Sequence, residues 1–541
     1  MLILPLEPTD DRARPAFKDI ASCTRWLGQF QLTNLQQAHG VLSQELDEFN
    51  RYPMQGLERW RTLELLRETV ALIQADYAKK LLAKKLPLSA EEFLILAAIL
   101  NLWQQMVTGY QRCLQGLLAG DKQLTQYGAL LCQRCMVYSE LQIAEQLRSG
   151  YEVNSRIWQQ LHALYLFSEE QGFQHKPVSD ELKGKDYAVT CHTIYIKILL
   201  TCYARPEELT RSQLQLLERW LIQWSAIITV ESDYTLSQGD ALPLALDMSG
   251  SQGLQALRQS NPSPASNMRY LPMLPLSKLL RVKTVLLQQG QSPQQLELGD
   301  AGSSADCIEL LTRLHQNWCE ESNDYAPGVS LPQAQLCAGV EEIYARIANK
   351  HFKPLSKNAG VDTAESKQIA TFGRVLSEDK RHDLADSDLA LETWILEQGS
   401  MFSARLMREG MAGMRLGANQ IVAVRTENNP AFMLGTLSWV RVKQTGHLSV
   451  GVRYLPGMVQ TIVINGTGIN TGASNKSVAA LLLPAVPTLK IPTSLVLPRG
   501  WFEPGRIIEM VRADHTKANV KLELSVDKGA DYERVSYTLL T

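Results

Sequence analysis

The sequence predicts an α+β, multidomain fold in which an N-terminal all-α helical region is followed by a C-terminal antiparallel β-barrel region. Three observations support this prediction. The chain has 541 residues, more than one hydrophobic core usually supports. Apolar residues recur with a helical period through most of residues 20–228. Beyond residue 420, short β-rich runs alternate with turn residues at intervals of about 8 to 12 residues, which is typical of an antiparallel sheet or barrel.

The helical domain is predicted to span residues 1–230. Leu66, Val70, Ile73 and Tyr77 follow one another at spacings of four, three and four, which indicates one stripe of an amphipathic helix. Residues 89–92, Ser-Ala-Glu-Glu, form a capping-box pattern that predicts a helix over about 90–118. The same pattern recurs at residues 210–213, before another apolar stripe. We therefore expect helices packed on helices.

The next part, residues 231–352, is predicted to be a loop-rich joint and a smaller helical unit. Around 231–264 the sequence is rich in Gly, Ser, Pro and Gln, which favour turns and loops. Helical periodicity returns over about 276–289, 307–320 and 331–348. The region shows no fixed repeat of 30 to 45 residues, so nothing supports a solenoid.

Residues 370–541 are predicted to form the β-barrel region. The expected strands are 421–425, 432–442, 448–455, 460–464, 495–497, 507–511, 520–526 and 535–540. Asn-Asn-Pro at 428–430 and Pro-Arg-Gly at 498–500 supply turns between them. The sequence leaves open whether the strands after residue 460 complete one barrel or form a second.

Composition and cysteine use indicate a cytoplasmic protein. With 45% hydrophobic and 20% charged residues the chain has a globular composition, which excludes wholesale disorder. Nine cysteines, odd in number and widely spread, are typical of reduced thiols. The first residues lack the parts of a signal peptide. The longest apolar stretch, 93–107, is shorter than the roughly 20 residues of a bilayer span, so no membrane span is expected.

Candidate metal and acid–base residues have simpler structural explanations. Cys132 and Cys135 form a C-x-x-C motif, but no second ligand pair lies nearby, so we interpret them as helix-packing residues. His315 and Cys319 stand four apart and could share a metal, but the sequence positions no third ligand, which favours packing or surface roles. Residues 180–181 and the acidic residues within 383–388 lie in polar segments and are expected to be solvated loop carboxylates. We expect no metal and no cofactor.

The sequence also lacks the common enzyme signatures. It contains no Walker loop, no Gly-rich dinucleotide loop, no G-x-S-x-G elbow and no H-E-x-x-H motif, so a non-enzymatic protein is predicted. Residues 401–541 hold sixteen Lys or Arg against nine Asp or Glu, an excess of seven positive charges. This excess favours an anionic ligand, although a solvated surface explains it equally well. Nucleic acid is not the expected ligand, because aromatic residues are sparse and indicate no stacking platform.

Three runs, residues 417–425, 434–441 and 448–455, resemble the strands of a PilZ-type β-barrel. Residues 392–396 resemble the strand that leads into that family's ligand motif, and the resemblance extends over 372–456. PilZ domains are small barrels that bind the second messenger cyclic di-GMP. A long helical region ahead of a divergent PilZ-like barrel is also similar to a group of proteobacterial proteins of uncharacterised role.

The resemblance implies candidate ligand-binding residues. PilZ domains carry Arg-x-x-x-Arg before the barrel and Asp/Asn-x-Ser-x-x-Gly on a strand. The second motif aligns with residues 398–403, where Ser400 matches, while Arg374 and Arg381 are available for the first without its spacing. Guanidinium groups bind phosphates and stack on guanine. We therefore expect Arg374, Arg381 and Arg405 to contact phosphates and Ser400 to contact a base.

Other residues of this region are expected to serve the fold. Trp394 and Trp439 are predicted to fill the barrel core, and Gly435 and Gly451 suit tight curvature.

Two functions follow as hypotheses. In the first, the protein is a regulatory receptor or adaptor whose helical region engages an unidentified protein partner and whose degenerate PilZ-like barrel binds cyclic di-GMP. In the second, it is a ligand-free scaffold or chaperone-like interaction protein. The basic barrel favours the first hypothesis, and the incomplete ligand motif favours the second.

Overall fold

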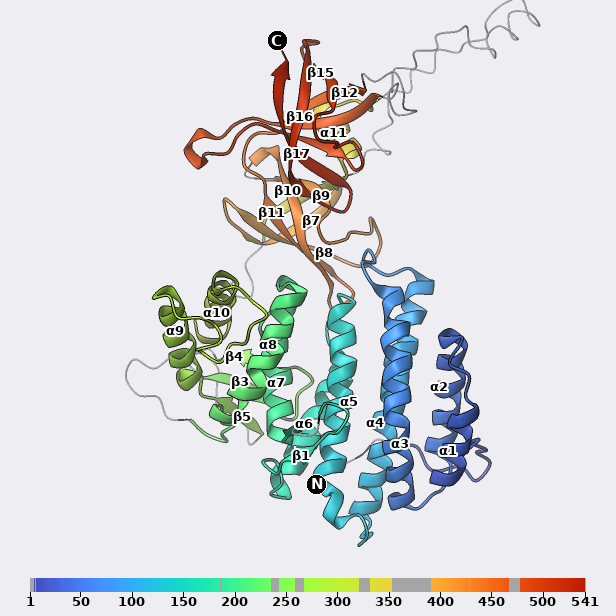
Figure 1. Cartoon of the computed structure of the whole chain (residues 1–541). Coiled ribbons are helices and arrows are strands. Elements are labelled where there is room, and N and C mark those ends of the chain that lie inside the picture. The colour runs from blue at the N-terminus through green and yellow to red at the C-terminus, as the bar shows by residue number, and fades with distance from the viewer. Residues whose placement is uncertain are drawn as a thin grey trace, which may run out of the picture. The chain divides into compact units, whose positions relative to one another are not determined.

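The described chain divides into two compact units. The computed structural model describes residues 4, 6–184, 187–234, 243–257, 267–320, 331–352, 391–427, 429–466 and 477–540. One unit comprises residues 1–84 and 88–324, and the other comprises residues 85–87 and 325–541. The predicted α+β organisation, with a helical region followed by antiparallel barrels, is confirmed (Figure 1). The finer division at residues 230, 352 and 370 stays a prediction.

The first unit is a bundle of helices. Its α-helices are α1 (Ile20–Gln29), α2 (Leu35–Arg51), α3 (Gly56–Tyr77), α4 (Ala90–Leu118), α5 (Gly128–Arg148), α6 (Ser155–Glu170), α7 (Cys191–Tyr203), α8 (Arg211–Trp224), α9 (Leu274–Gln288) and α10 (Ser304–Cys319). Short 3-10 helices are η1 (Ala78–Leu81), η2 (Thr125–Tyr127), η3 (Pro206–Glu208) and η4 (Ser225–Ile227). The predicted capping boxes begin α4 and α8: the Ser89 hydroxyl accepts a hydrogen bond from the Glu92 N–H, and Thr210 does the same for Gln213.

Helix α4 lies at the centre of the bundle. It packs against α2, α3 and α5, and Leu66, Val70 and Ile73 of the predicted stripe on α3 are fully buried. Among the described residues, α4 is the one helix long and apolar enough to cross a bilayer. A core helix of a soluble bundle meets the same criteria, so the expected absence of a membrane span stays a prediction.

Small sheets accompany the helices. Strands β1 (Val178–Ser179) and β2 (Ala188–Val189) form a hairpin, and β3 (Leu244–Asp247) pairs with β4 (Gln255–Ala256) and β5 (Met268–Leu271). Strands β3 and β4 of the second sheet lie in the stretch around 231–264 that was expected to be loop, and β5 follows it. The strands of this sheet have two to four residues, too few for a hydrophobic period to be visible in the sequence.

The expectation that Asp180 is solvated is wrong. Its side chain is 2% exposed, and both carboxylate oxygens accept hydrogen bonds from Arg67 at 2.7 Å. Arg134 lies 3.6 Å from the same carboxylate and 3.0 Å from Glu64, so two buried arginines are balanced by two carboxylates. Burial alone would raise the pKa of Glu64, but Arg134, Arg67 and the Tyr110 hydroxyl lower it below its usual value.

The second unit contains two closed antiparallel barrels. In the first, the strand order is β10 (Asn429–Val442), β11 (Leu448–Tyr454), β8 (Ser403–Arg408), β7 (Glu392–Gly399), β6 (Gln333–Ala338) and β9 (Ile421–Thr426). In the second, the order is β12 (Gln460–Gly466), β13 (Ser477–Leu483), β14 (Ser494–Pro498), β17 (Tyr532–Leu540), β16 (Lys517–Lys528) and β15 (Ile507–Arg512), with η5 (Pro487–Leu489) after β13. The predicted strands are present, and the last strands form a second barrel.

Helix α11 (Val340–Ala348) joins the two barrels into one core. Its Ile343 packs in a cluster with Leu434 of the first barrel and Leu481 of the second. Two hydrogen bonds reinforce the junction: the Ile421 N–H donates to Asp531 Oδ1 at 2.9 Å, and the Ala530 N–H donates to the Asn419 carbonyl at 2.7 Å.

The prediction of a helix over residues 331–348 is wrong for the first part of this range and correct for the second. Residues 333–338 form β6, and only residues 340–348 form a helix, α11. Gly339 separates them with a φ of +91°, a backbone conformation that favours glycine. Strand β6 completes the first barrel by pairing with β7 and β9.

Candidate functional site

The hairpin formed by β7 and β8 carries the residues that resemble the PilZ ligand motif. Its tip, residues 400–402, is closed by Ser400, whose N–H donates to the Ser403 carbonyl at 2.8 Å. The Ser400 hydroxyl accepts hydrogen bonds from the N–H groups of Phe402 and Ser403, at 3.2 and 3.0 Å. Met401 and Phe402 project from the tip, 83% and 64% exposed. Ser400 therefore shapes an exposed turn beside the outer face of the barrel.

Alternate residues of β8 and β11 face opposite sides of the barrel wall. Ala404 and Leu406 are buried inside, whereas Ser403, Arg405 and Met407 face outward. Because directly paired residues of neighbouring strands share one face, the register assigns Gly451 and Arg453 of β11 to the outer face as well: Arg405 pairs with Gly451, and Ser403 pairs with Arg453.

An indole and a guanidinium meet on this outer face. Trp439 of β10 pairs with Gly451, and the Arg405 guanidinium carbon lies 5.5 Å from the centroid of the Trp439 ring. A Cβ atom at Gly451 would overlap the indole nitrogen of Trp439, so the ring lies directly over the glycine. The absence of a side chain on β11 thus lets Trp439 cross this strand and reach Arg405, a cation–π arrangement.

Two further residues extend the surface along β11. Ser449, two positions before Gly451, is buried, and its hydroxyl has no hydrogen-bond partner in the part of the chain that the structure describes. Arg453, two positions after Gly451, is exposed. We call Arg405, Trp439, Ser449, Gly451 and Arg453 the barrel platform. It combines two guanidinium groups, an aromatic ring and a buried hydroxyl.

The structure brings together two of the four predicted ligand residues, Ser400 and Arg405, which lie on one hairpin. Arg374 and Arg381 lie outside the described residues. Trp394 fills the barrel interior as predicted, fully buried with the Arg408 guanidinium carbon 5.3 Å from its ring centroid. Trp439, expected in the core, lies instead on the outer face, where it is 8% exposed beside Arg405.

Ser449 and Arg453 were missed by sequence reasoning. The signal that could have found them is the alternation Ser-Val-Gly-Val-Arg over 449–453, in which both valines face the interior.

The residues considered for metal binding or redox chemistry are either buried in a helix or hydrogen-bonded to other side chains. Cys132 and Cys135 are buried in α5, and burial raises the pKa of the Cys135 thiol. The His315 imidazole contacts the Ser277 hydroxyl at 2.9 Å and Glu320 at 3.1 Å. Across the described ranges, no three His, Cys, Asp or Glu side chains are grouped so that they could hold a metal ion.

Comparisons with known proteins match both ends of the chain to one family. Residues 21–233 match the family model described as the N-terminal domain of the cyclic-di-GMP receptor FimW, and residues 467–540 match the FimW C-terminal β-barrel domain. Two separate parts of the chain are thus similar to FimW domains. The cyclic-di-GMP receptor FimW of Pseudomonas aeruginosa is 21% identical over 527 residues, covering 90% of this chain and 85% of that protein. No solved structure matches the chain.

The two FimW domain models map onto distinct parts of the fold. The N-terminal model covers α1 to α8, and the C-terminal model covers β13 to β17 of the second barrel. The first barrel, with the barrel platform, lies between the two matched segments.

Proposed function

We propose that this protein is a non-enzymatic, cytoplasmic receptor for cyclic di-GMP and that it binds the nucleotide on the barrel platform. Similarity to the two FimW domain models supports the ligand, because the relative from Pseudomonas aeruginosa is a cyclic-di-GMP receptor. The observation that carries the location is the contact between Arg405 and Trp439 over Gly451.

The chemistry of the platform suits this ligand. Cyclic di-GMP presents two guanine bases and two phosphates. A guanidinium group that rests on an indole offers its other face to a base and its N–H edge to phosphate oxygens. Arg405 can serve both purposes, and Arg453 supplies a second cation on the same outer face. The seven excess positive charges of residues 401–541 favour approach of a dianion.

The remaining candidates complete the proposal. We assign Arg374 and Arg381, which precede β7 in the sequence, to phosphate contacts. Ser400 shapes the turn at the tip of the β7–β8 hairpin, and we propose that it holds this turn beside the bound base. The helical unit would then engage a protein partner, so that the protein acts as an adaptor between nucleotide and partner.

Isothermal titration with cyclic di-GMP tests the proposal, with GTP and cyclic di-AMP as controls. We expect micromolar or tighter binding that is specific for cyclic di-GMP, and at least a tenfold loss of affinity for Arg405→Ala, equivalent to about 1.4 kcal/mol. The matched control is Arg506→Ala, which removes an arginine stacked on Trp501 in the second barrel, at 5.1 Å, and should leave the affinity unchanged.

Two results would contradict the proposal in different ways. Full affinity in Arg405→Ala would exclude the barrel platform, and the double variant Arg374→Ala/Arg381→Ala would then show whether the segment before β7 binds the nucleotide. No detectable heat and no thermal shift with the unmodified chain would exclude a receptor and favour the ligand-free scaffold.

A further inference from the structure

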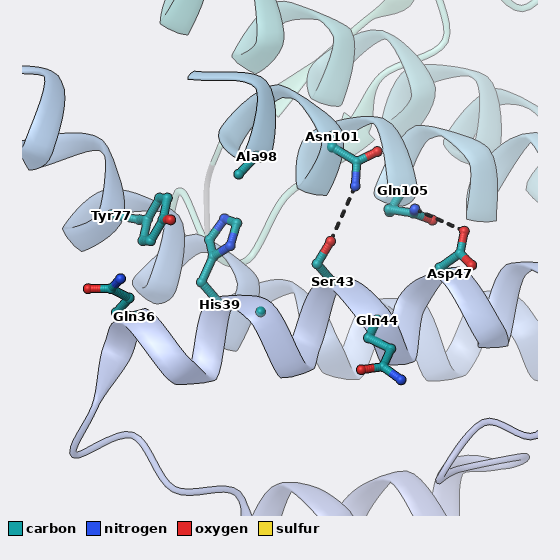
Figure 2. A pocket seen from close by; sticks show the side chains of 10 residues that line it. Gln36, His39, Ser43, Gln44, Asp47, Tyr77, Ala98, Asn101 and Gln105 are labelled. Atoms are coloured by element: carbon teal, nitrogen blue, oxygen red, sulfur yellow. Dashed lines mark hydrogen bonds between the residues drawn. The ribbon is translucent and has the colours of Figure 1, made fainter. Parts of the chain in front are cut away.

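The helical unit has a polar groove that the nucleotide proposal does not use. Two adjoining hollows, of about 540 and 670 Å³, share Asp47 and Gln105. Figure 2 shows the first hollow between α2 and α4, where the Asn101 amide donates to the Ser43 hydroxyl at 3.2 Å and the Gln105 amide donates to Asp47 at 3.3 Å. The second hollow continues past Asn50 toward α6. We call the two together the amide groove.

Asn and Gln are frequent in this lining. Gln36, Gln44 and Asn101 line the first hollow, and Gln104, Gln111 and Gln160 line the second. An amide side chain offers a carbonyl acceptor and N–H donors, the same groups that each peptide unit of a polypeptide backbone offers. A groove lined by amides is therefore complementary to a polypeptide backbone in both hydrogen-bonding roles.

Two of these amides have donors without a partner. Gln111 is 2% exposed, and neither its Nε2 nor the Nε2 of Gln160 has a hydrogen-bond partner among the described residues. A buried donor without a partner destabilises the fold, because it has lost its hydrogen bonds to water. Asn50 Oδ1, an acceptor in the same lining, also has no partner among the described residues. A ligand that offers both acceptors and donors, as a polypeptide backbone does, would satisfy these groups once the side chains turn toward it.

The protein's own chain indicates the kind of ligand. Leu4, Leu6 and Glu7, which precede the first helix without regular secondary structure, form part of the wall of the second hollow. Burial lowers the pKa of Arg112, which lines the same hollow, and the negative charge of Glu7 opposes that shift. An irregular piece of polypeptide with an apolar-x-apolar-acidic sequence thus already lies against the amides.

The dimensions of the groove fit a short extended segment. It follows α2 from Gln36 to Arg51, a distance of roughly 22 Å at about 1.5 Å per helical residue. An extended chain advances about 3.3 Å per residue, so about seven residues fit. A single nucleobase would fill only a fraction of this length.

We propose that the amide groove binds an extended segment of a partner protein, of apolar-x-apolar-acidic sequence, through hydrogen bonds between its side-chain amides and the partner's backbone. This inference rests on the adaptor role proposed above and gives that role a surface. In the absence of the partner, Leu4, Leu6 and Glu7 occupy one end of the groove and compete with it.

A synthetic peptide of residues 2–10 with a fluorescent label, followed by anisotropy, tests the inference. The unmodified chain should bind it weakly, because its own segment competes intramolecularly. A variant lacking residues 1–7 should bind this peptide at least tenfold more tightly than the unmodified chain does. The same variant should bind a peptide of scrambled sequence at least tenfold more weakly than the original peptide. In this shortened variant, Gln111→Leu should reduce the affinity at least tenfold.

Gln133→Leu is the matched control. Gln133 of α5 is also a buried amide whose Nε2 has no partner among the described residues, but it does not line the groove. Its replacement should leave peptide binding unchanged. If the shortened chain does not fold, Leu4→Asp/Leu6→Asp in the full chain displaces the same segment.

Three outcomes would overturn the inference: no peptide binding by a folded variant, equal binding of the scrambled peptide, or equal losses from Gln111→Leu and Gln133→Leu. Titration of the same variants with cyclic di-GMP separates the two proposals. If the variants bind the nucleotide but not the peptide, the amide-groove proposal is excluded and the nucleotide proposal stands. If they bind the peptide but not the nucleotide, the nucleotide proposal is excluded and the amide-groove proposal stands.

Discussion

At Gly451, the absence of a side chain decides where Trp439 lies. Trp439 was predicted to fill the core, and regular alternation along β10 would place it on the same side as Leu437, which is buried. The register of β10 against β11 shifts between Leu437 and Trp439, so the side-chain alternation changes at this β-bulge. A bulge depends on pairing with a partner strand, and the residues of β10 alone do not reveal it.

Gly451→Ala tests this arrangement. A Cβ atom at this position would overlap the Trp439 indole, which must then move away from Arg405. We expect about 1 to 3 kcal/mol of destabilisation from overpacking and at least a tenfold loss of cyclic di-GMP affinity, measured by urea unfolding and titration. Gly28→Ala in α1, where nothing lies within 4 Å, should be neutral or stabilising by up to about 1 kcal/mol. Unchanged cyclic di-GMP affinity in Gly451→Ala would show that the Trp439 indole does not take part in nucleotide binding.

Among the elements, local chemistry was the best guide. The capping boxes at Ser89 and Thr210 predicted the starts of α4 and α8 correctly, because a cap involves residues within one turn of the helix. Strands β8 and β13 were not predicted. The apolar run of β13, with Leu481–Leu483 buried, has no period-two alternation because one side faces the barrel interior and the other packs in the core around α11.

Helix α11 should couple the stability of the two barrels. Ile343→Ala removes a fully buried side chain from the cluster shared by both, and we expect it to cost about 2 to 5 kcal/mol. Hydrogen exchange should therefore increase in β9 of the first barrel and in β13 of the second. Ile507→Ala, at an isoleucine that is 45% exposed, should change the stability by less than about 0.5 kcal/mol. Increased exchange confined to one barrel would show that α11 does not couple them.

At the scale of the whole molecule, the number of barrels was beyond sequence reasoning. Closure of the first barrel depends on β6, where Cys337 pairs with Ala423, 86 residues later. No local pattern encodes such a pairing, and the short run of β6 was interpreted as part of the helix that follows it. The charge excess indicated the barrel region and the Ser400 alignment indicated the β7–β8 hairpin as a candidate ligand site, because neither depends on long-range register.

Three buried histidines give the whole molecule a predictable dependence on pH. His39, His162 and His192 are each at most 5% exposed, and burial lowers the pKa of each below its usual 6.5. The unfolded chain therefore binds more protons than the folded chain as the pH falls below about 7, so the free energy of unfolding should decrease from pH 7.5 to 5.5. Thermal denaturation followed by circular dichroism measures the decrease.

His162→Gln should make this decrease smaller. The His162 ring contacts the Tyr195 hydroxyl at 2.8 Å and the Gln252 carbonyl at 2.9 Å, and the charge of Asp247 only partly offsets the effect of burial. Glutamine does not titrate, so the variant should be less stable at pH 7.5 but should lose less stability on acidification. His515→Gln, at an exposed histidine of the second barrel, should leave the slope unchanged. An equal slope in His162→Gln would mean that groups other than this histidine take up the protons on unfolding.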